Sequence, residues 1–343
     1  MVATAEKLSG PSIETIESLL DVTYTWGYTE TREKLRDLYD KAVRAQWISD
    51  DVLPWSNDVD LDKPMGPEQL MPLFGSDILA KMTDKERQQL NRETISWTLS
   101  QFLHGEQGAL LATAQLVDSV TDLDSKLYAA SQVVDEARHV DVYNRYIHTK
   151  IGFSYPVNPH LKTLLDMILK DSRWDMKFLG MQIMVEGLAL AAFGMIRTNT
   201  DEPLLKELTA YVMGDEARHV AFGILSLRDF YREQPESVKR EREDFVFEAA
   251  RLMRERFLFQ EVWEKMGLPT KQCMDLALNS PGQVMFRQML FAKIVPAIKK
   301  MDLLSERQRG RFQELGILQF ENWADPLADL NTSASGGVSA RMS

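Results

Sequence analysis

Two copies of one six-residue sequence carry the side chains with the clearest potential for chemistry. Residues 135–140 are Asp-Glu-Ala-Arg-His-Val, and residues 215–220 repeat them letter for letter. In each copy a glutamate and a histidine lie three residues apart, so a helix places both on one face, about one turn from each other. Two such helices that face each other present carboxylates and imidazoles to one point, which suits a metal ion. The pairs are Glu136 with His139 and Glu216 with His219.

Two further glutamates share one spacing from these repeats. Glu106 and Glu186 each lie thirty residues before the glutamate of a repeat. A straight helix of that length spans about 45 Å, so a shared site requires a turn halfway along each interval. Both midpoints are rich in helix-capping residues: residues 119–124 are Ser-Val-Thr-Asp-Leu-Asp, and residues 200–203 are Thr-Asp-Glu-Pro. Each half of the sequence therefore predicts a helical hairpin.

Two such hairpins place four carboxylates and two histidines together, which is the ligand arrangement of two-metal four-helix bundles. Iron and manganese both accept this set of oxygen and nitrogen ligands. Four cysteine thiolates would instead indicate zinc, and the set contains none. The acids that begin the repeats, Asp135 and Asp215, are candidates to orient the histidines, and Arg138 and Arg218 can neutralise those acids. The alternative is a pair of helices with surface Glu–Arg pairs, but the matched spacing of the two earlier glutamates disfavours it.

Composition narrows the class of protein. The chain has 343 residues, of which 44% are hydrophobic and 27% charged, as in an ordinary globular protein. Its net charge of −11 disfavours nucleic acid as the main partner. A single cysteine, Cys273, excludes an internal disulfide and suits the cytoplasm. The sequence shows no secretory signal and no uninterrupted apolar run of membrane-spanning length, so we expect no membrane association.

The distribution of proline and polar residues sets the expected domain organisation. Residues 1–11 and 331–343 are small and polar and are expected to be disordered. Residues 12–330 are expected to form a single helical domain, which begins with a helix over residues 12–47. Its core bundle is expected at about residues 88–232, and strand signals are nearly absent. The predicted fold is all-α, a four-helix bundle with additional helices at both ends.

The six ligand positions and this layout resemble the ferritin-like diiron-carboxylate superfamily, within its ribonucleotide-reductase-small-subunit-like and diiron oxygenase branch. The resemblance covers roughly residues 35–232. It implies metal ligation by the four glutamates and two histidines, with Asp135 and Asp215 bonding the histidines across the site. The segment around Trp47 is similar to the one that carries a tryptophan in the radical-bearing reductase subunit, and residues 101–106 resemble the first ligand helix of the ligand-binding oxidases.

Several positions depart from the members of that branch. Tyr143 stands where the reductase subunit carries its radical tyrosine. Leu190 replaces the threonine typical of the multicomponent monooxygenases. Gly108 and Met181 occupy the positions of the Val–Tyr crosslink of the ligand-binding oxidases, so that crosslink cannot form. Val212 replaces the third histidine of the arylamine N-oxygenases.

Small and flexible side chains near the ligands predict a substrate pocket. Glycine and alanine leave space beside the metals, and methionine adapts to irregular apolar shapes. Plain core packing of the helices is the alternative explanation. The expected lining residues are Gly105, Ala109, Met181, Met184, Leu190 and Phe193.

The resemblance implies an O2-dependent diiron oxygenase or oxidase that acts on a small to medium, partly apolar organic molecule. Hydroxylation or N-oxygenation is the expected reaction type, and desaturation or C–C cleavage is the alternative. Two iron ions per chain are expected, with an Mn/Fe pair open, and O2 is the co-substrate. A ferredoxin or reductase would supply electrons, and a homodimer is expected. The alternatives are a radical-generating reductase-like subunit that uses Tyr143, a ferroxidase or iron-binding protein, and a bundle with a vestigial site.

Overall fold

The computed structural model describes residues 13–29, 32–63, 66–323 and 327. The expected disordered segments, residues 1–11 and 331–343, lie outside this description. Helices and their connections account for the described part of the chain, which contains no strand, as the all-α prediction requires. The α-helices and several short 3₁₀- or π-helical segments surround one core of buried apolar side chains.

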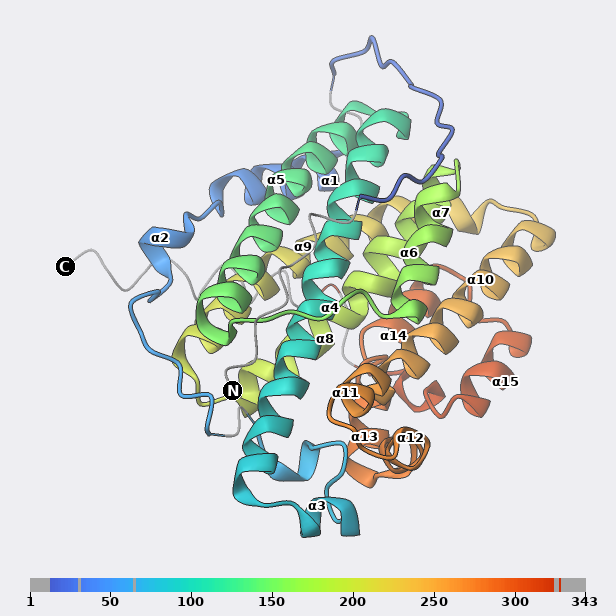
Figure 1. The fold of residues 1–343 in the computed structure, drawn as a ribbon. Coiled ribbons are helices and arrows are strands. Elements are labelled where there is room, and N and C mark those ends of the chain that lie inside the picture. Colours follow the sequence, from blue (N-terminus) through green and yellow to red (C-terminus); the bar gives the residue numbers. More distant parts are fainter. Residues whose placement is uncertain (1–12, 30–31, 64–65, 324–326, 328–343) are drawn as a thin grey trace.

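Four long helices form the centre of the molecule as two antiparallel hairpins (Figure 1). The first hairpin pairs α4 (Asp84–Ser119) with α5 (Leu123–Tyr146), and the second pairs α8 (Glu186–Asn199) with α9 (Pro203–Arg232). Both turns fall at the predicted midpoints. Asp122 caps α5, since its carboxylate accepts from the amide of Ser125 at 2.8 Å. Glu202 caps α9, with proline at the first helical position.

The second hairpin is preceded by two helical segments that run directly into it. These are α7 (Trp174–Phe178) and the π-helical segment η3 (Leu179–Val185), which leads into α8. The combined helix, Trp174–Asn199, is long and apolar enough to cross a membrane. However, 72% of its most apolar window is buried inside the protein. It is therefore a core helix of the bundle, as its apolar character on all sides predicts.

The expected helix over residues 12–47 is wrong in its first half. Residues 13–29 are not helical, and α1 begins only at Glu33 and ends at Arg44. Residues 22–28 are Val-Thr-Tyr-Thr-Trp-Gly-Tyr, and β-branched residues, aromatic residues and glycine all disfavour a helix. The segment instead pairs with the end of α4, where the amide of Thr23 donates to the carbonyl of Asp118 at 2.9 Å.

The remaining helices cover the bundle from two sides. In Figure 1, α1 and the short α2 (Ser49–Val52) lie on one side, and α10 to α15 lie together on the other. Leu35, Leu38 and Ala42 are the buried face of α1. The other elements are η1 (Glu68–Leu70), α3 (Asp77–Lys81), η2 (Ile147–Ile151), α6 (Pro159–Lys170), α10 (Glu236–Glu255), η4 (Arg256–Leu258), α11 (Gln260–Lys265), α12 (Thr270–Asn279), α13 (Pro281–Met289), α14 (Ile294–Lys300), α15 (Glu306–Glu314) and η5 (Leu318–Phe320).

Candidate metal centre

The bundle brings the six predicted ligand side chains to one place, one or two from each long helix. None of the six is more than 5% exposed. The π-helical segment η3 ends directly before the glutamate of α8, and such segments often occur at functional sites because they shift the helical register. The side chains are Glu106 from α4, Glu136 and His139 from α5, Glu186 from α8, and Glu216 and His219 from α9.

The carboxylates converge on one ring nitrogen of each histidine. Nδ1 of His139 lies 3.2 Å from Oε2 of Glu106 and 3.2 Å from Oε1 of Glu216. Nδ1 of His219 lies 3.1 Å from Oε1 of Glu136 and 3.6 Å from the same Glu216 oxygen. Two sets of donor atoms each lie within 4.8 Å of one another. The first set is Glu106, Glu136, His139 and Glu216, and the second is Glu136, Glu186 and His219.

Most of these atoms approach one another without forming hydrogen bonds. Oε2 of Glu136, Oε2 of Glu186, both carboxylate oxygens of Glu216 and Nδ1 of His219 are buried and have no hydrogen-bond partner. Buried carboxylates without partners cost several kcal/mol each unless a cation or a proton compensates them. Their lone pairs point at shared positions, as metal ligands do. The donor set therefore fits a pair of oxygen- and nitrogen-preferring ions such as iron or manganese.

The second nitrogen of each histidine is held by an aspartate from the opposite hairpin. Nε2 of His139 lies 3.1 Å from Oδ2 of Asp215, and Nε2 of His219 lies 3.3 Å from Oδ2 of Asp135. A proton on each Nε2 therefore leaves each Nδ1 free to bind a metal. This cross-site pairing is the one that the resemblance implied.

Two arginines and a tryptophan surround those aspartates. Arg138 and Arg218 each form an ion pair with the aspartate three residues earlier in its own helix. Arg138 also reaches Asp215 at 3.3 Å. The indole nitrogen of Trp47 donates to Oδ2 of Asp215 at 2.8 Å, so the segment after α1 is joined to the site.

Burial and neighbouring charges move the pKa values of these groups in opposite directions. Burial raises the pKa of Glu106 to about 8, despite the opposing charge of His139. Burial likewise raises the pKa of Glu186 well above its usual range. For Glu136, burial raises the pKa, but the two histidines outweigh burial and hold the pKa below its usual range. A metal-free centre thus retains protons that metal ions would displace.

One glutamine that the sequence analysis did not single out orients two of the ligands. Nε2 of Gln132 donates to Oε1 of Glu136 at 3.0 Å and to Oε1 of Glu186 at 2.9 Å. It is fully buried on α5, one turn before Glu136. The spacing of four residues was visible in the sequence, but a glutamine at that spacing is common in helices and gave no distinctive signal.

A narrow slot lies beside the cluster between α4 and α8. Its volume is about 340 Å³ counted with its opening, but its free interior is only about the size of a water molecule. Of the predicted pocket residues, Gly105, Ala109 and Phe193 line it. The others, Met181, Met184 and Leu190, are buried in the core and do not line this slot. Arg256 also lines the slot, and the sequence analysis did not foresee it.

The hydroxyl of Tyr143 is buried near the cluster and has no hydrogen-bond partner. Burial and the charge of Glu106 raise its pKa well above the usual value. Its ring packs against Phe193 and Phe102, with centroids 5.8 Å and 6.2 Å apart. Within the described residues, no acid accepts a hydrogen bond from this tyrosine.

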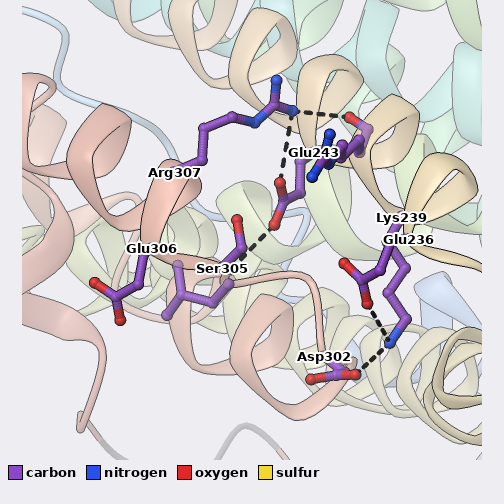
Figure 2. A pocket seen from close by; sticks show the side chains of 9 residues that line it. Glu236, Lys239, Glu243, Asp302, Ser305, Glu306 and Arg307 are labelled. Atoms are coloured by element: carbon purple, nitrogen blue, oxygen red, sulfur yellow. Dashed lines mark hydrogen bonds and ion pairs between the residues drawn. The ribbon is translucent and has the colours of Figure 1, made fainter.

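A larger hollow, of about 990 Å³ counted with its opening, lies on the surface between α10 and α15 (Figure 2). Its charges already pair with one another. Glu243 accepts from the amide of Ser305 at 3.0 Å and lies 3.5 Å from Arg307. Lys239 pairs with Asp302 on the same surface. These pairs occupy several of its ionic groups, and none of its lining residues belongs to the metal-ligand cluster.

The family comparison agrees with the chemistry of the cluster. The model of the family described as p-aminobenzoate N-oxygenase AurF matches residues 28–302, which include every proposed ligand. The chain belongs to this family. It is therefore a non-haem diiron oxidoreductase, of the diiron oxygenase and oxidase class. No curated protein matches the sequence of this AurF-family chain.

Solved structures similar to this AurF-family chain are distant. A mutant R2-like ligand-binding oxidase with an anaerobically reconstituted Mn/Fe cofactor is 17% identical, with a TM-score of 0.49, over 78% of this chain and 93% of its own. An R2-like ligand-binding oxidase with an aerobically reconstituted metal cofactor after photoconversion is 18% identical, with a TM-score of 0.45, over 80% and 92%.

This AurF-family chain differs from the arylamine N-oxygenases at one position beside the candidate metal centre. Val212 is fully buried on α9, one turn before Glu216, at the position of their third histidine. A valine cannot ligate a metal. The cluster therefore offers four glutamates and two histidines as candidate ligands, with no third histidine at this position.

Proposed function

We propose that the protein is an O2-dependent diiron N-oxygenase of a small to medium, partly apolar organic amine, with hydroxylation of a similar molecule as the related reaction. Family membership supports the oxygenase class. The observation that carries the proposal is the convergence of buried, partnerless carboxylate oxygens and a histidine nitrogen beside a slot whose wall includes small apolar and aromatic residues.

Two iron ions fit the two donor sets. Glu106 and His139 would bind one ion, Glu186 and His219 would bind the other, and Glu136 and Glu216 would lie between them. When bound, the iron pair supplies the electrons and coordination positions with which O2 is activated. An Mn/Fe pair uses the same donors, since both metals accept this oxygen and nitrogen set.

The protein side chains hold this centre and keep water away from it. Gln132 fixes two glutamates, and the two cross-site aspartates fix the tautomer and orientation of the histidines. Phe102 and Phe193 pack edge to face with centroids 4.8 Å apart on the wall of the slot. A substrate therefore reaches the centre only when aromatic side chains of this wall move.

The balance of the proposed reaction requires an external reductant. The amine nitrogen gains one oxygen atom of O2, and the other oxygen leaves as water with two electrons and two protons from a donor. A ferredoxin or a flavin reductase is the class of donor that we propose. We further propose a cytoplasmic location, in line with the one cysteine, Cys273, which is free and buried. We also propose a homodimer, which follows from the resemblance and from the apolar helix faces.

The test is single-turnover oxygenation. Purified protein is loaded anaerobically with Fe(II), mixed with 4-aminobenzoate or aniline, and exposed to O2, and products are measured by mass spectrometry with ¹⁸O2. Incorporation of ¹⁸O at nitrogen or carbon supports the proposal. A Glu136→Ala variant serves as the metal-deficient control. Oxidation of the iron without incorporation into any amine would instead favour a ferroxidase.

One observation keeps a radical-generating subunit as a second candidate. The partnerless hydroxyl of Tyr143 lies in the same buried environment as Glu106. The same O2 exposure, followed by electron paramagnetic resonance, separates the candidates. A lasting tyrosyl signal that disappears in Tyr143→Phe would support the radical subunit, whereas undiminished oxygenation in that variant supports the oxygenase.

A further inference from the structure

Arg256 is a buried cation on the wall of the slot that has no partner. Its side chain is 5% exposed, and it lines the slot with Glu106, Glu186 and Glu216. Its Nε is buried without a hydrogen-bond partner. Within the described residues, its guanidinium forms no hydrogen bond or ion pair, and its one polar contact is a cation–π contact with the neighbouring Phe257 ring at 4.7 Å.

Other buried arginines of the described chain show how unusual this is. Arg242 lies 2.9 Å from the carboxylate of Asp175. Arg218 pairs with Asp215, and Arg287 donates to the carbonyl of Ala277 at 2.7 Å. Burying a guanidinium without a partner is unfavourable, so an anion that pairs with Arg256 would be bound favourably.

The turn that follows Arg256 is packed against the bundle. The helix α10 ends at Glu255, and the turn that follows contains Phe259 in the left-handed region at φ 56°, ψ 32°. That conformation is costly for a phenylalanine. The ring of Phe259 packs on Trp97 of α4, with centroids 4.6 Å apart, which anchors the turn against the bundle. Arg256 thus reaches the slot from outside the four-helix core.

Once two divalent metal ions are bound, no negative side chain around the slot is left to balance the positive charge of Arg256. Four glutamates neutralise two divalent ions, and Asp135 and Asp215 pair with Arg138 and Arg218. Burial lowers the pKa of Arg256 to about 10, so the guanidinium stays protonated at neutral pH. One positive charge, partly desolvated, therefore faces the slot.

We propose that Arg256 binds a carboxylate group of the substrate and thereby selects organic monoanions. A planar guanidinium matches a carboxylate in shape and forms paired, charge-assisted hydrogen bonds with it. A single cation suits a monoanion better than a phosphate with a second charge. This inference rests on the proposed function only in that the slot is taken as the place of the substrate.

The test compares two ligands of equal size and different charge, benzoate and benzamide. Their binding to anaerobic, Fe(II)-loaded protein is measured by isothermal titration calorimetry, so no turnover is needed. We expect benzoate to bind at least about tenfold more tightly than benzamide, since a charge-assisted pair is lost in the amide. Arg256→Gln should abolish this preference, and Arg256→Lys should retain a part of it. Arg254→Gln, two residues away on α10 and partly exposed, is the matched control and should retain all of it.

Three outcomes would overturn the proposal. The first is equal or absent binding of the two ligands by the unaltered protein. The second is a benzoate preference that survives in Arg256→Gln, since the carboxylate then binds the iron instead. The third is a loss of iron from Arg256→Gln while the preference for benzoate over benzamide is unchanged. The positive charge of the arginine would then serve to balance the charge of the glutamates rather than to bind a substrate. Failure of the oxygenase proposal would appear separately, as absent ¹⁸O incorporation in a protein that still prefers benzoate.

Discussion

Asp215 lies across the bundle from the histidine of the other repeat, with its Oδ2 3.1 Å from Nε2 of His139. Each repeat thus supplies the aspartate that orients the histidine of its partner, and the two hairpins are coupled through the site. Asp215 is only 2% exposed. Burial raises the pKa of its carboxyl, but the bond with His139 and the nearby positive charges together outweigh burial and hold that pKa low. The residue therefore remains an ionised acceptor for the histidine N–H.

Asp215→Asn should weaken metal binding by about 10- to 100-fold, because the amide no longer fixes the tautomer of His139. The measurement is competition for Fe(II) or Zn²⁺ against a chromophoric chelator. Asp229→Asn alters an exposed ion pair on the same helix and should leave metal affinity unchanged. Parent-like affinity in Asp215→Asn would show that the aspartate does not orient a ligand.

The two donor sets predict a pattern of metal stoichiometry. We expect about two metal ions per chain in the parent protein, about one in Glu106→Ala and about one in Glu186→Ala, because each of these glutamates belongs to one set only. Glu136→Ala should lose both, since Glu136 belongs to both sets. Elemental analysis after desalting decides this. Equal loss in all three variants would contradict separate positions.

The stability of the metal-free protein should fall as pH rises from about 4.5 to about 8. Over this window the folded protein keeps the proton of Glu106, whose pKa is about 8, while the unfolded chain has lost it at about 4.5. The folded state then binds more protons, so raising the pH favours unfolding. The raised pKa values of His139 and His219, which burial opposes and neighbouring carboxylates produce, act in the same direction.

Glu106→Gln isolates the contribution of that glutamate. This variant should reduce the slope of unfolding free energy against pH by up to about 1.4 kcal/mol per unit, the effect of one proton. Urea denaturation of metal-free samples at several pH values measures it. A slope identical to that of the parent would mean that Glu106 does not keep its proton in the fold.

Two helical glycines should respond oppositely to alanine. A Cβ at Gly105, beside the slot, meets no atom within 4 Å, so Gly105→Ala should stabilise the protein by about 0.5–1 kcal/mol through helix propensity. A Cβ at Gly223 would lie 2.8 Å from Cβ of Gln182, where α9 packs against η3. Gly223→Ala should therefore destabilise by about 1–3 kcal/mol. Chemical denaturation compares the two, and shifts of the same sign would contradict the packing described.

The sequence alone predicted the hairpins because their signals are local. Helical periodicity places residues three apart on one face, capping residues mark the turns, and equal arms return the chain to its starting level. The sequence did not predict that residues 13–29 are non-helical, because polar and apolar residues there also fit an amphipathic helix. What overrode that pattern was weak helix propensity and pairing with the end of α4.

The sequence determined which ligand types this chain offers and that two equal hairpins present them, since both follow from residue identity and spacing. It did not determine which atoms meet across the bundle. Gln132 spans two helices, and Arg256 reaches the slot from a turn beyond the core, 150 residues after Glu106. Only the tertiary structure decided those contacts, because packing between distant segments leaves no periodic signal in the chain.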